Sequence, residues 1–154
     1  MIILSRRSML AIAATVDVAL FARPDPVSTK QMAQRHNLPP RHLESLLQTL
    51  VRSGILKGMR GPRGGYSLAR ERRRISIGDI VRASLQPVNG SAGEDEETRS
   101  INSPLVETVV QPMIARASEA FLQSLDGISV EDLCNKAEAE GLEGGYALNA
   151  DFTI

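Results

Sequence analysis

The stretch from Leu56 to Leu68, LKGMRGPRGGYSL, constrains the fold of this chain more than any other. It predicts two short β-strands joined by a tight basic tip, because glycine tolerates positive φ angles and proline fixes φ. Tyr66 and Leu68 alternate with Ser67, so one face of the hairpin can lie on a core. No Lys-Ser or Lys-Thr pair follows these glycines, as a nucleotide-binding P-loop would require. Glycine-rich hairpins are also ordinary connections, so the neighbouring segments decide what this one does.

Three helical patterns precede the hairpin, over residues 5–22, 28–36 and 39–53. The second opens with Ser28 and has Gln31 three positions later, which is the pattern of a capping box. The residues expected to face the core are Met9, Ile12, Ala13, Val16 and Leu20 in the first pattern, Met32 and Ala33 in the second, and Leu43, Leu46, Leu47, Leu50 and Val51 in the third. Two short helices joined by a brief turn match a helix-turn-helix, and a hairpin directly after them makes it a winged one.

Charge is divided unevenly between the two parts of the chain. Residues 1–84 contain 15 Lys and Arg against 5 Asp and Glu, whereas residues 85–154 contain 3 against 13, so the whole chain is neutral. A basic half indicates a polyanionic partner, and an acidic half indicates a solvated or protein-facing part. Within the basic half, the arginine run from Arg70 to Arg74 is expected to be a solvated charged surface.

The sequence predicts a mainly α-helical protein with four parts. They are a winged helix-turn-helix with a two-stranded β wing over residues 1–84, a flexible acidic loop over residues 85–103, dimerisation helices over residues 104–140 and a tail over residues 141–154. The pair Ser76 and Asp79 predicts a capping box that opens a short helix at the end of the first part.

A long helix is predicted from Ser103 to about Leu125, and a capped helix from Ser129 to about Glu140 follows it. Pro112 should kink or split the long helix. The apolar surface of this helix is wider than packing on one small domain requires, so we expect a helix partner, most simply a second copy of the chain. The expected dimerisation residues are Val106, Val110, Met113, Ala117 and Phe121.

The N-terminus allows two interpretations. The segment from Ser5 to Val16 is similar to a twin-arginine export signal, but Asp17 interrupts its apolar run, and a first helix fits the rest of the chain better. No run of apolar residues is long enough for a transmembrane helix, so we expect a cytoplasmic protein without a membrane partner.

The chain has one cysteine, Cys134, so a disulfide framework within one chain is excluded. No Cys and His residues have the spacing of a zinc site. Cys134 is either a redox-sensing thiol or an inert core residue, and its place in an amphipathic segment favours the inert one.

Several segments resemble the Rrf2 family of bacterial regulators, which includes IscR, NsrR and CymR. The matching segments are RGPRGGYSLA from Arg60, ISIGDI from Ile75, Val27-Ser28, His42-Leu43-Glu44, Ser53-Gly54-Ile55-Leu56, Phe121-Leu122 and ISVEDL from Ile128. The resemblance covers roughly residues 3–135. It implies a winged-helix homodimer that binds a double-stranded DNA operator, usually as a repressor, with the recognition helix in the major groove and the wing in the minor groove.

The resemblance also suggests which residues contact DNA. Arg41, His42, Glu44 and Ser45 match the start of the recognition helix, Arg60 matches the wing arginine, Arg63 and Tyr66 accompany it, and Ser28, Thr29, Lys30, Arg52 and Lys57 are candidates for phosphate contacts. The chemistry agrees, because Arg pairs with guanine in the major groove and Glu accepts from cytosine. Arginines on a narrow glycine tip also suit the negative minor groove. For Ser28, a capping role alone is the competing interpretation.

Two departures from the family pattern affect these expectations. Cluster-binding relatives carry three cysteines in the loop before the long helix, whereas residues 86–103 contain none, so we expect no iron–sulfur cluster, no other cofactor and no metal. Pro39 and Pro40 occupy a turn where the family usually has a small hydroxyl cap, so major-groove readout can differ. The controlling effector, a small molecule or a protein, is left open.

Two classes of function compete. The leading one is a sequence-specific DNA-binding regulator. The alternative is a winged-helix protein-interaction module without DNA binding, in which the acidic half is the partner surface. An enzyme is not indicated, because the sequence shows no nucleophile–base pair, metal site or nucleotide loop.

Overall fold

The computed structural model describes residues 4–86 and 103–144, and within them the chain is mainly helical with one two-stranded antiparallel sheet. The helices are α1 (Arg6–Phe21), α2 (Thr29–His36), α3 (Arg41–Arg52), α4 (Ile77–Ser84), α5 (Gln111–Asp126) and α6 (Val130–Ala139), and the strands are β1 (Leu56–Met59) and β2 (Gly65–Leu68). The shorter turns are η1 (Arg72–Arg74), η2 (Val106–Val110) and η3 (Leu142–Gly144). The predicted winged helix-turn-helix with a two-stranded wing and a long C-terminal helix is confirmed.

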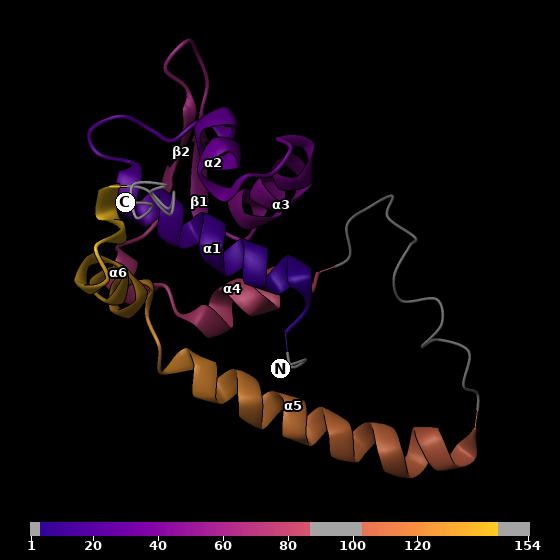
Figure 1. Cartoon of the computed structure of the whole chain (residues 1–154). Coiled ribbons are helices and arrows are strands. Elements are labelled where there is room, and N and C mark those ends of the chain that lie inside the picture. The colour runs from indigo at the N-terminus through magenta and orange to yellow at the C-terminus, as the bar shows by residue number, and fades with distance from the viewer. Residues whose placement is uncertain (1–3, 87–102, 145–154) are drawn as a thin grey trace, which may run out of the picture.

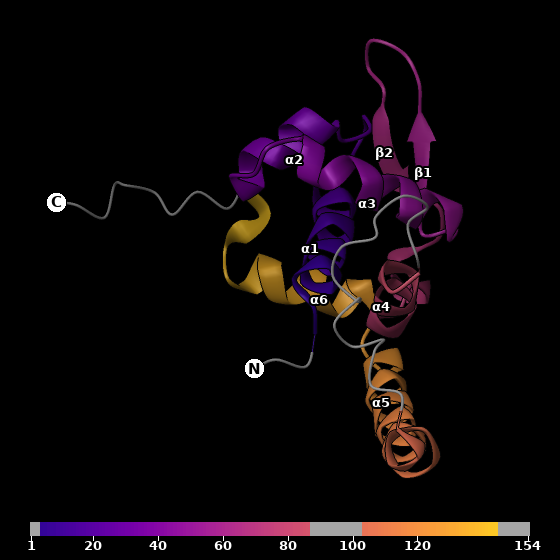
Figure 2. The ribbon, with the colours of Figure 1, turned by 90° about the vertical axis from the view of Figure 1, so that its right-hand side faces the viewer.

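Helix α1 runs through the middle of a body formed by α1 to α4, the wing and α6 (Figure 1). The wing projects from one end of this body, and α5 lies at the opposite end (Figures 1 and 2). The core is made chiefly by α1, the leucines of α3, and apolar residues of β1, α4 and α6.

Helix α1 is buried along a different face from the one that its pattern predicts. Ala11, Thr15 and Val18 are buried, whereas Met9 is 56% exposed and the rest of the predicted stripe is only partly buried. The predicted stripe is therefore correct only in part: Ile12, Val16 and Leu20 pack against the core from its edge, whereas Met9 is exposed. α1 packs against α3, α4, α6 and β2, so small side chains lie where these elements approach closely and larger ones lie at the rim.

Helices α2 and α3 form the helix-turn-helix. The predicted capping box of α2 is confirmed, because the backbone N–H of Gln31 donates to the Ser28 hydroxyl (3.2 Å) and the Ser28 N–H donates to the Gln31 side chain (3.0 Å). Asn37 ends α2 with a left-handed φ of 52°, which its short side chain tolerates. Met32 and Ala33 are buried as predicted, and so are Leu43, Leu46, Leu47 and Leu50, while Val51 is half-buried.

The wing is tied to the segment that precedes α2. β1 and β2 pair from Leu56 opposite Leu68 to Met59 opposite Gly65. Val27 and Tyr66 exchange two backbone hydrogen bonds of 2.9 and 2.8 Å, which adds the entry to α2 onto the free edge of β2. A Cβ atom on Gly65 would collide with the Val27 carbonyl, so this pairing requires glycine. The wing and the start of α2 are therefore held as one unit.

The C-terminal helices follow the sequence prediction closely. The capping boxes that begin α4 at Ser76 and α6 at Ser129 are both present. Pro112 does interrupt the long helix, because η2 is a π-helical turn in which the Gln111 N–H bonds to the Val106 carbonyl. The wider turn accommodates the proline, and the helix continues as α5.

Most of the predicted acidic loop and of the predicted tail lies outside the described residues. Within residues 4–86 and 103–144, no helix is long and apolar enough to cross a membrane.

Candidate nucleic-acid interface

A groove of about 840 Å³ lies between the N-terminus of α2, one side of α3 and the wing. Its walls include Ser28 and Thr29 from the start of α2, Gln48 and Arg52 from α3, and Arg60 and Tyr66 from the wing. These elements form the end of the molecule opposite α5 (Figure 2). Three segments that are separate in sequence thus contribute to one polar, basic surface.

Five of the twelve predicted DNA-contacting residues line this groove: Ser28, Thr29, Arg52, Arg60 and Tyr66. The other seven do not line it, and all of them are exposed: Lys30, Arg41, His42, Glu44, Ser45, Lys57 and Arg63. Of these seven, four lie in the first turns of α3 and the others lie on α2, on β1 and near the wing tip. The residues predicted to read bases therefore stand beside the groove, at the exposed start of α3.

The basic side chains of this surface are available to a polyanion. Among the described residues, no acidic side chain forms an ion pair with Arg41, Arg52, Lys57, Arg60 or Arg63. Elsewhere in the body, Arg35, Arg72 and Arg82 are each paired with carboxylates. Exposed cations without a carboxylate partner can neutralise DNA phosphates.

Two of the predicted contact residues also have clear structural roles. The Ser28 hydroxyl already accepts a hydrogen bond from the Gln31 N–H as the cap of α2. Its own O–H can still donate to a phosphate. Tyr66 is half-buried and holds the wing to Val27 through its backbone. Both residues fix the geometry of the groove whether or not they touch DNA.

Gln48 is a candidate that the sequence analysis did not include. It lies on the exposed side of α3, three residues after Ser45 and four before Arg52, and it lines the groove opposite the wing. A glutamine side chain can form two hydrogen bonds with adenine. The helical spacing of Ser45, Gln48 and Arg52 is the signal that could have identified it.

Asp17 is a second residue whose role the sequence did not reveal. Its side chain is fully buried in α1, and Arg35 of α2 donates two hydrogen bonds to it, of 2.9 and 2.6 Å. His36 Nε2 lies 3.1 Å from the same carboxylate. Burial raises the pKa of Asp17, but the hydrogen bonds and charges of Arg35 and His36 outweigh it, so the pKa lies below 3.8. This cluster fixes the end of α2 on α1, and α2 in turn supports α3.

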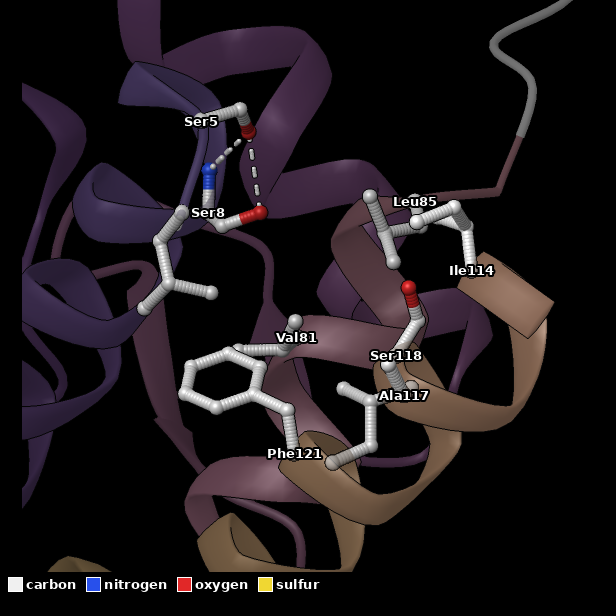
Figure 3. Close-up of a pocket in the computed structure, with 10 residues that line it drawn as sticks. Ser5, Ser8, Val81, Leu85, Ile114, Ala117, Ser118 and Phe121 are labelled. Carbon is white, nitrogen blue, oxygen red and sulfur yellow. Dashed lines mark hydrogen bonds between the residues drawn. The ribbon is translucent and has the colours of Figure 1, made fainter. Parts of the chain in front are cut away.

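The predicted dimerisation residues lie on and before α5, away from the groove. Val110 and Met113 are 43% and 67% exposed, Ala117 is exposed, and Val106 and Phe121 are partly buried. Ala117 and Phe121 also line a cavity of about 320 Å³ between α1, α4 and α5 (Figure 3). Exposed apolar side chains thus continue from Leu105, Val109 and Val110, which precede α5, to Met113 and Ile114 on α5.

Cys134 is buried in α6, and burial raises the pKa of its thiol. The nearby Arg72 opposes this shift only in part. Arg72 also pairs with Glu131 (3.6 Å) and Glu138 (4.0 Å), so the prediction that Arg70 to Arg74 is simply a solvated surface is wrong for this residue. A buried, protonated thiol is unreactive, which agrees with the inert alternative for Cys134.

Comparison with known proteins agrees with this geometry. The profile of the Rrf2 family, described as "Iron-dependent Transcriptional regulator", matches residues 4–136. The chain is 33% identical to the HTH-type transcriptional regulator CymR of Bacillus subtilis over 75% of its own length and 77% of CymR. It is also 33% identical to slr0846 of Synechocystis sp. over 95% and 97% of the two chains.

Solved structures show the same fold. The structure of T. potens IscR is similar, with a TM-score of 0.66 and 28% identity over 89% of each chain. The structure of B. subtilis CymR, the "Global Cysteine Regulator", matches with a TM-score of 0.64 and 26% identity over 86% of this chain and 96% of CymR.

The iron in the family description can be tested against the side chains present. The chain has one cysteine, and Cys134 is fully buried in α6. In the described residues, no three His, Cys, Asp or Glu side chains come together in a way that could hold a metal ion. These donors do not fit an iron–sulfur cluster held by several thiolates.

Proposed function

This chain belongs to the Rrf2 family of DNA-binding transcriptional regulators, and from that premise we propose that it binds an operator as a homodimer and represses transcription there. The observation that carries the proposal is the convergence of α3, the start of α2 and the wing on one surface whose cations lack carboxylate partners. No observation favours the alternative of a protein-interaction module.

Helix α3 is the proposed recognition helix. Arg41, Glu44 and Ser45 lie at its exposed N-terminal end, and this is the part of a recognition helix that contacts base edges in the major groove. Pro40 begins the helix without a side-chain cap, and the His42 and Leu43 N–H groups donate to the Pro39 and Pro40 carbonyls, at 3.0 Å each. These N–H groups are therefore already bonded, so the proposed contacts of α3 with DNA are made by its side chains.

The wing is the proposed minor-groove probe. Arg60 and Arg63 flank a tip in which Gly61 has a φ of 117°, a conformation that side-chain-bearing residues rarely adopt. The tip is therefore narrow, and arginines inserted beside it are attracted to the negative potential of a narrow minor groove. Because Val27 and Tyr66 join the wing to the start of α2, both grooves are contacted by one rigid unit.

A second copy of the chain is the proposed partner of α5. The exposed apolar side chains of η2 and α5 include Val110, Met113 and Ile114. Burying them against the same surface of a second copy forms a two-fold interface, which is the commonest way that soluble proteins dimerise. Two recognition helices then face two operator half-sites.

We further propose that the dimer acts in the cytoplasm, where operator DNA is present, and that it carries no iron–sulfur cluster. The lone buried Cys134 is the reason for the second statement. The test is anaerobic reconstitution with iron and sulfide, followed by absorbance and iron analysis. A visible absorbance band with stoichiometric iron contradicts the proposal.

The DNA-binding surface is tested by gel shift on the promoter region recovered with the chain from cells. We expect Arg60→Ala and Arg41→Ala each to weaken binding by about 1–3 kcal/mol, the range for a lost specific contact. Lys136→Ala is the matched control, because Lys136 is an exposed cation on α6, outside the groove. If both arginine variants bind like the unchanged chain, the proposed surface is wrong.

A further inference from the structure

Helix α5 packs closely on the body at its C-terminal end, whereas its earlier residues are exposed. Its first residues, from Gln111 to Ala120, are all exposed, and in Figure 1 this part of the helix extends beyond the body. Its last turn lies against α4, where Leu122 and Leu125 pack on the core. A helix held in this way acts as an arm, and the contacts at its attached end decide its direction.

The attached end is held by an arginine clamp. Arg82 of α4 donates two hydrogen bonds to the Asp126 carboxylate, of 2.6 and 2.9 Å. The Ser76 hydroxyl donates a third to the same carboxylate at 3.3 Å. The hydrogen bonds from Arg82 hold the pKa of Asp126 below its usual range, so the carboxylate stays charged. Bidentate geometry of this kind restricts orientation as well as distance.

Arg82 also reaches a second point on α5. Its guanidinium lies 3.9 Å from Glu119, which precedes Asp126 by seven residues, or about two helical turns. Two contacts separated along the helix axis constrain the direction of α5 more strongly than one contact could.

The backbone around the clamp allows the two helices to meet closely. A Cβ atom on Gly78 would collide with the Asp126 carboxylate, so a larger residue at this position would displace that side chain from its contact with Arg82. Beside it, the Ile77 N–H donates to the Ile128 carbonyl (2.8 Å) and the Val130 N–H donates to the Ile75 carbonyl (2.9 Å). The end of α5 is thus fixed to the start of α4 by both side chains and backbone.

Farther along α5, between this helix, α1 and α4, there is open space. Figure 3 shows Phe121 and Ala117 on α5 facing Val81 and Ser8 across the cavity of about 320 Å³. Leu85 and Ile114, which also line the cavity, are each 61% exposed. The cavity leaves side chains of α5 without close packing on this side, so the contacts at the attached end, the clamp among them, restrain the angle of the helix.

We infer that Arg82 and Asp126 are positioning residues that set the direction of α5 and thereby the separation of the two recognition helices in the dimer. The clamp then determines which spacing between operator half-sites the protein prefers. This inference rests on the proposed homodimer and its operator binding.

The test measures spacing preference with the full-length chain. Operators are prepared with the half-site separation unchanged, shortened or lengthened by one base pair, and affinities are measured for the unchanged chain, Arg82→Gln and Asp126→Asn. We expect either variant to reduce the discrimination between the best and the neighbouring spacings by about fivefold, the most that an exposed ion pair usually contributes. Arg82→Lys keeps the positive charge but loses the bidentate contact. Its discrimination between spacings should lie between that of the unchanged chain and that of Arg82→Gln.

Lys136→Gln is the control, since it removes another exposed ion pair, the 2.7 Å contact with Glu140 on α6. A clamp that only stabilised the fold would lower the affinity for all spacings equally and leave their ratio unchanged, which would overturn the inference. The proposed function fails separately, if the unchanged chain binds no operator.

A measurement without DNA supports or overturns the inference independently. Gln34→Cys in a Cys134→Ser background places one spin label on the exposed face of α2 in each protomer. Pulsed electron resonance should give a narrow distribution of distances between protomers, and Arg82→Gln should broaden or shift it. An unchanged distribution, or the absence of a dimer, overturns the inference.

Discussion

The two ends of this molecule differ in how their apolar residues are used. In α3 the leucines face inward, so the outward face is polar and lies beside a groove lined by Arg52 and Arg60. In η2 and α5 the side chains of Val110 and Met113 are exposed. Each end therefore exposes the chemistry that its partner has to match: cations for a polyanion, and apolar surface for the proposed second copy.

Apolar residues at the two ends also stabilise different things: the folded body at one end and the association with a partner at the other. A residue such as Leu47, fully buried in α3, contributes to the folding of the body itself. A residue such as Met113 is 67% exposed, so it contributes only when a partner covers it. Mutations at the two ends should consequently be detected by different measurements.

The largest effect is expected at Asp17. Removing its carboxylate with Asp17→Ala leaves Arg35 and His36 without their buried partner, and we expect a loss of about 3–5 kcal/mol in the free energy of unfolding. Urea denaturation followed by circular dichroism measures it. Asp25→Ala is the control, since Asp25 is exposed, and its effect should stay within about 0.5 kcal/mol. A similar small effect for Asp17→Ala means that the cluster does not hold α2.

The same residue gives a pH dependence. The pKa of Asp17 is lower in the folded protein than its usual 3.8, so its contribution to stability is complete well above pH 3.8. The contribution is lost as the pH falls below 3.8, when the unfolded state binds the proton more readily. Asp17→Asn should therefore show a flatter decline in stability at acidic pH than the unchanged chain. If the free energy of unfolding of both proteins falls equally with pH, Asp17 is not ionised in the folded protein.

A matched pair of truncations compares the two ends directly. Leu47→Ala should lower the free energy of unfolding of the body by about 2–5 kcal/mol, because it leaves a cavity in the core. Met113→Ala should change that free energy little at a concentration where the chain is monomeric, but it should weaken the dimer. Sedimentation equilibrium detects the second effect. Unfolding of the body by Met113→Ala would show that α5 belongs to the core.

At the DNA-binding end, Gln48→Ala should weaken operator binding by about 1–3 kcal/mol if its amide contacts a base. Because such a contact is specific, the loss of affinity should be confined to operators that have the original base at the contacted position. The variant should also accept other bases at that position. Binding-site selection with randomised operators measures this. An unchanged preference at every position would exclude Gln48 from base readout.

The smallest effect is expected at the phosphate candidates. Lys57→Ala should weaken binding to all sequences about equally and reduce the slope of log affinity against log salt concentration by about one. Lys136→Ala, on α6, should leave the slope unchanged. A change in sequence preference rather than in slope would assign Lys57 to base readout.

Much of this fold could be predicted from local patterns. The capping boxes at Ser28, Ser76 and Ser129 use only residues three positions apart, so the sequence contains all the information that they require. The leucine stripe of α3 was equally clear because large side chains recur on one face. The stripe of α1 was predicted only in part, since a helix packed on several sides buries small residues such as Ala11 and Ala14.

The candidate site was predictable in part. The family resemblance and the charge distribution indicated the wing and the start of α3, but they did not indicate Gln48, whose importance comes from facing the wing across the groove. The roles of Asp17 and Asp126 also depend on residues far away in sequence, 18 and 44 positions from their arginine partners. No local pattern specifies such pairs.

Local sequence patterns are sufficient to predict the order of helices and strands, their caps, the basic wing and the apolar surface of the long helix, because each depends on neighbouring residues and on backbone conformation. They do not predict which face of α1 is buried, that Asp17 pairs with α2, or that Arg82 pairs with Asp126 of α5. Burial and ion pairing depend on which elements meet in space, and that is set by the packing of the whole chain.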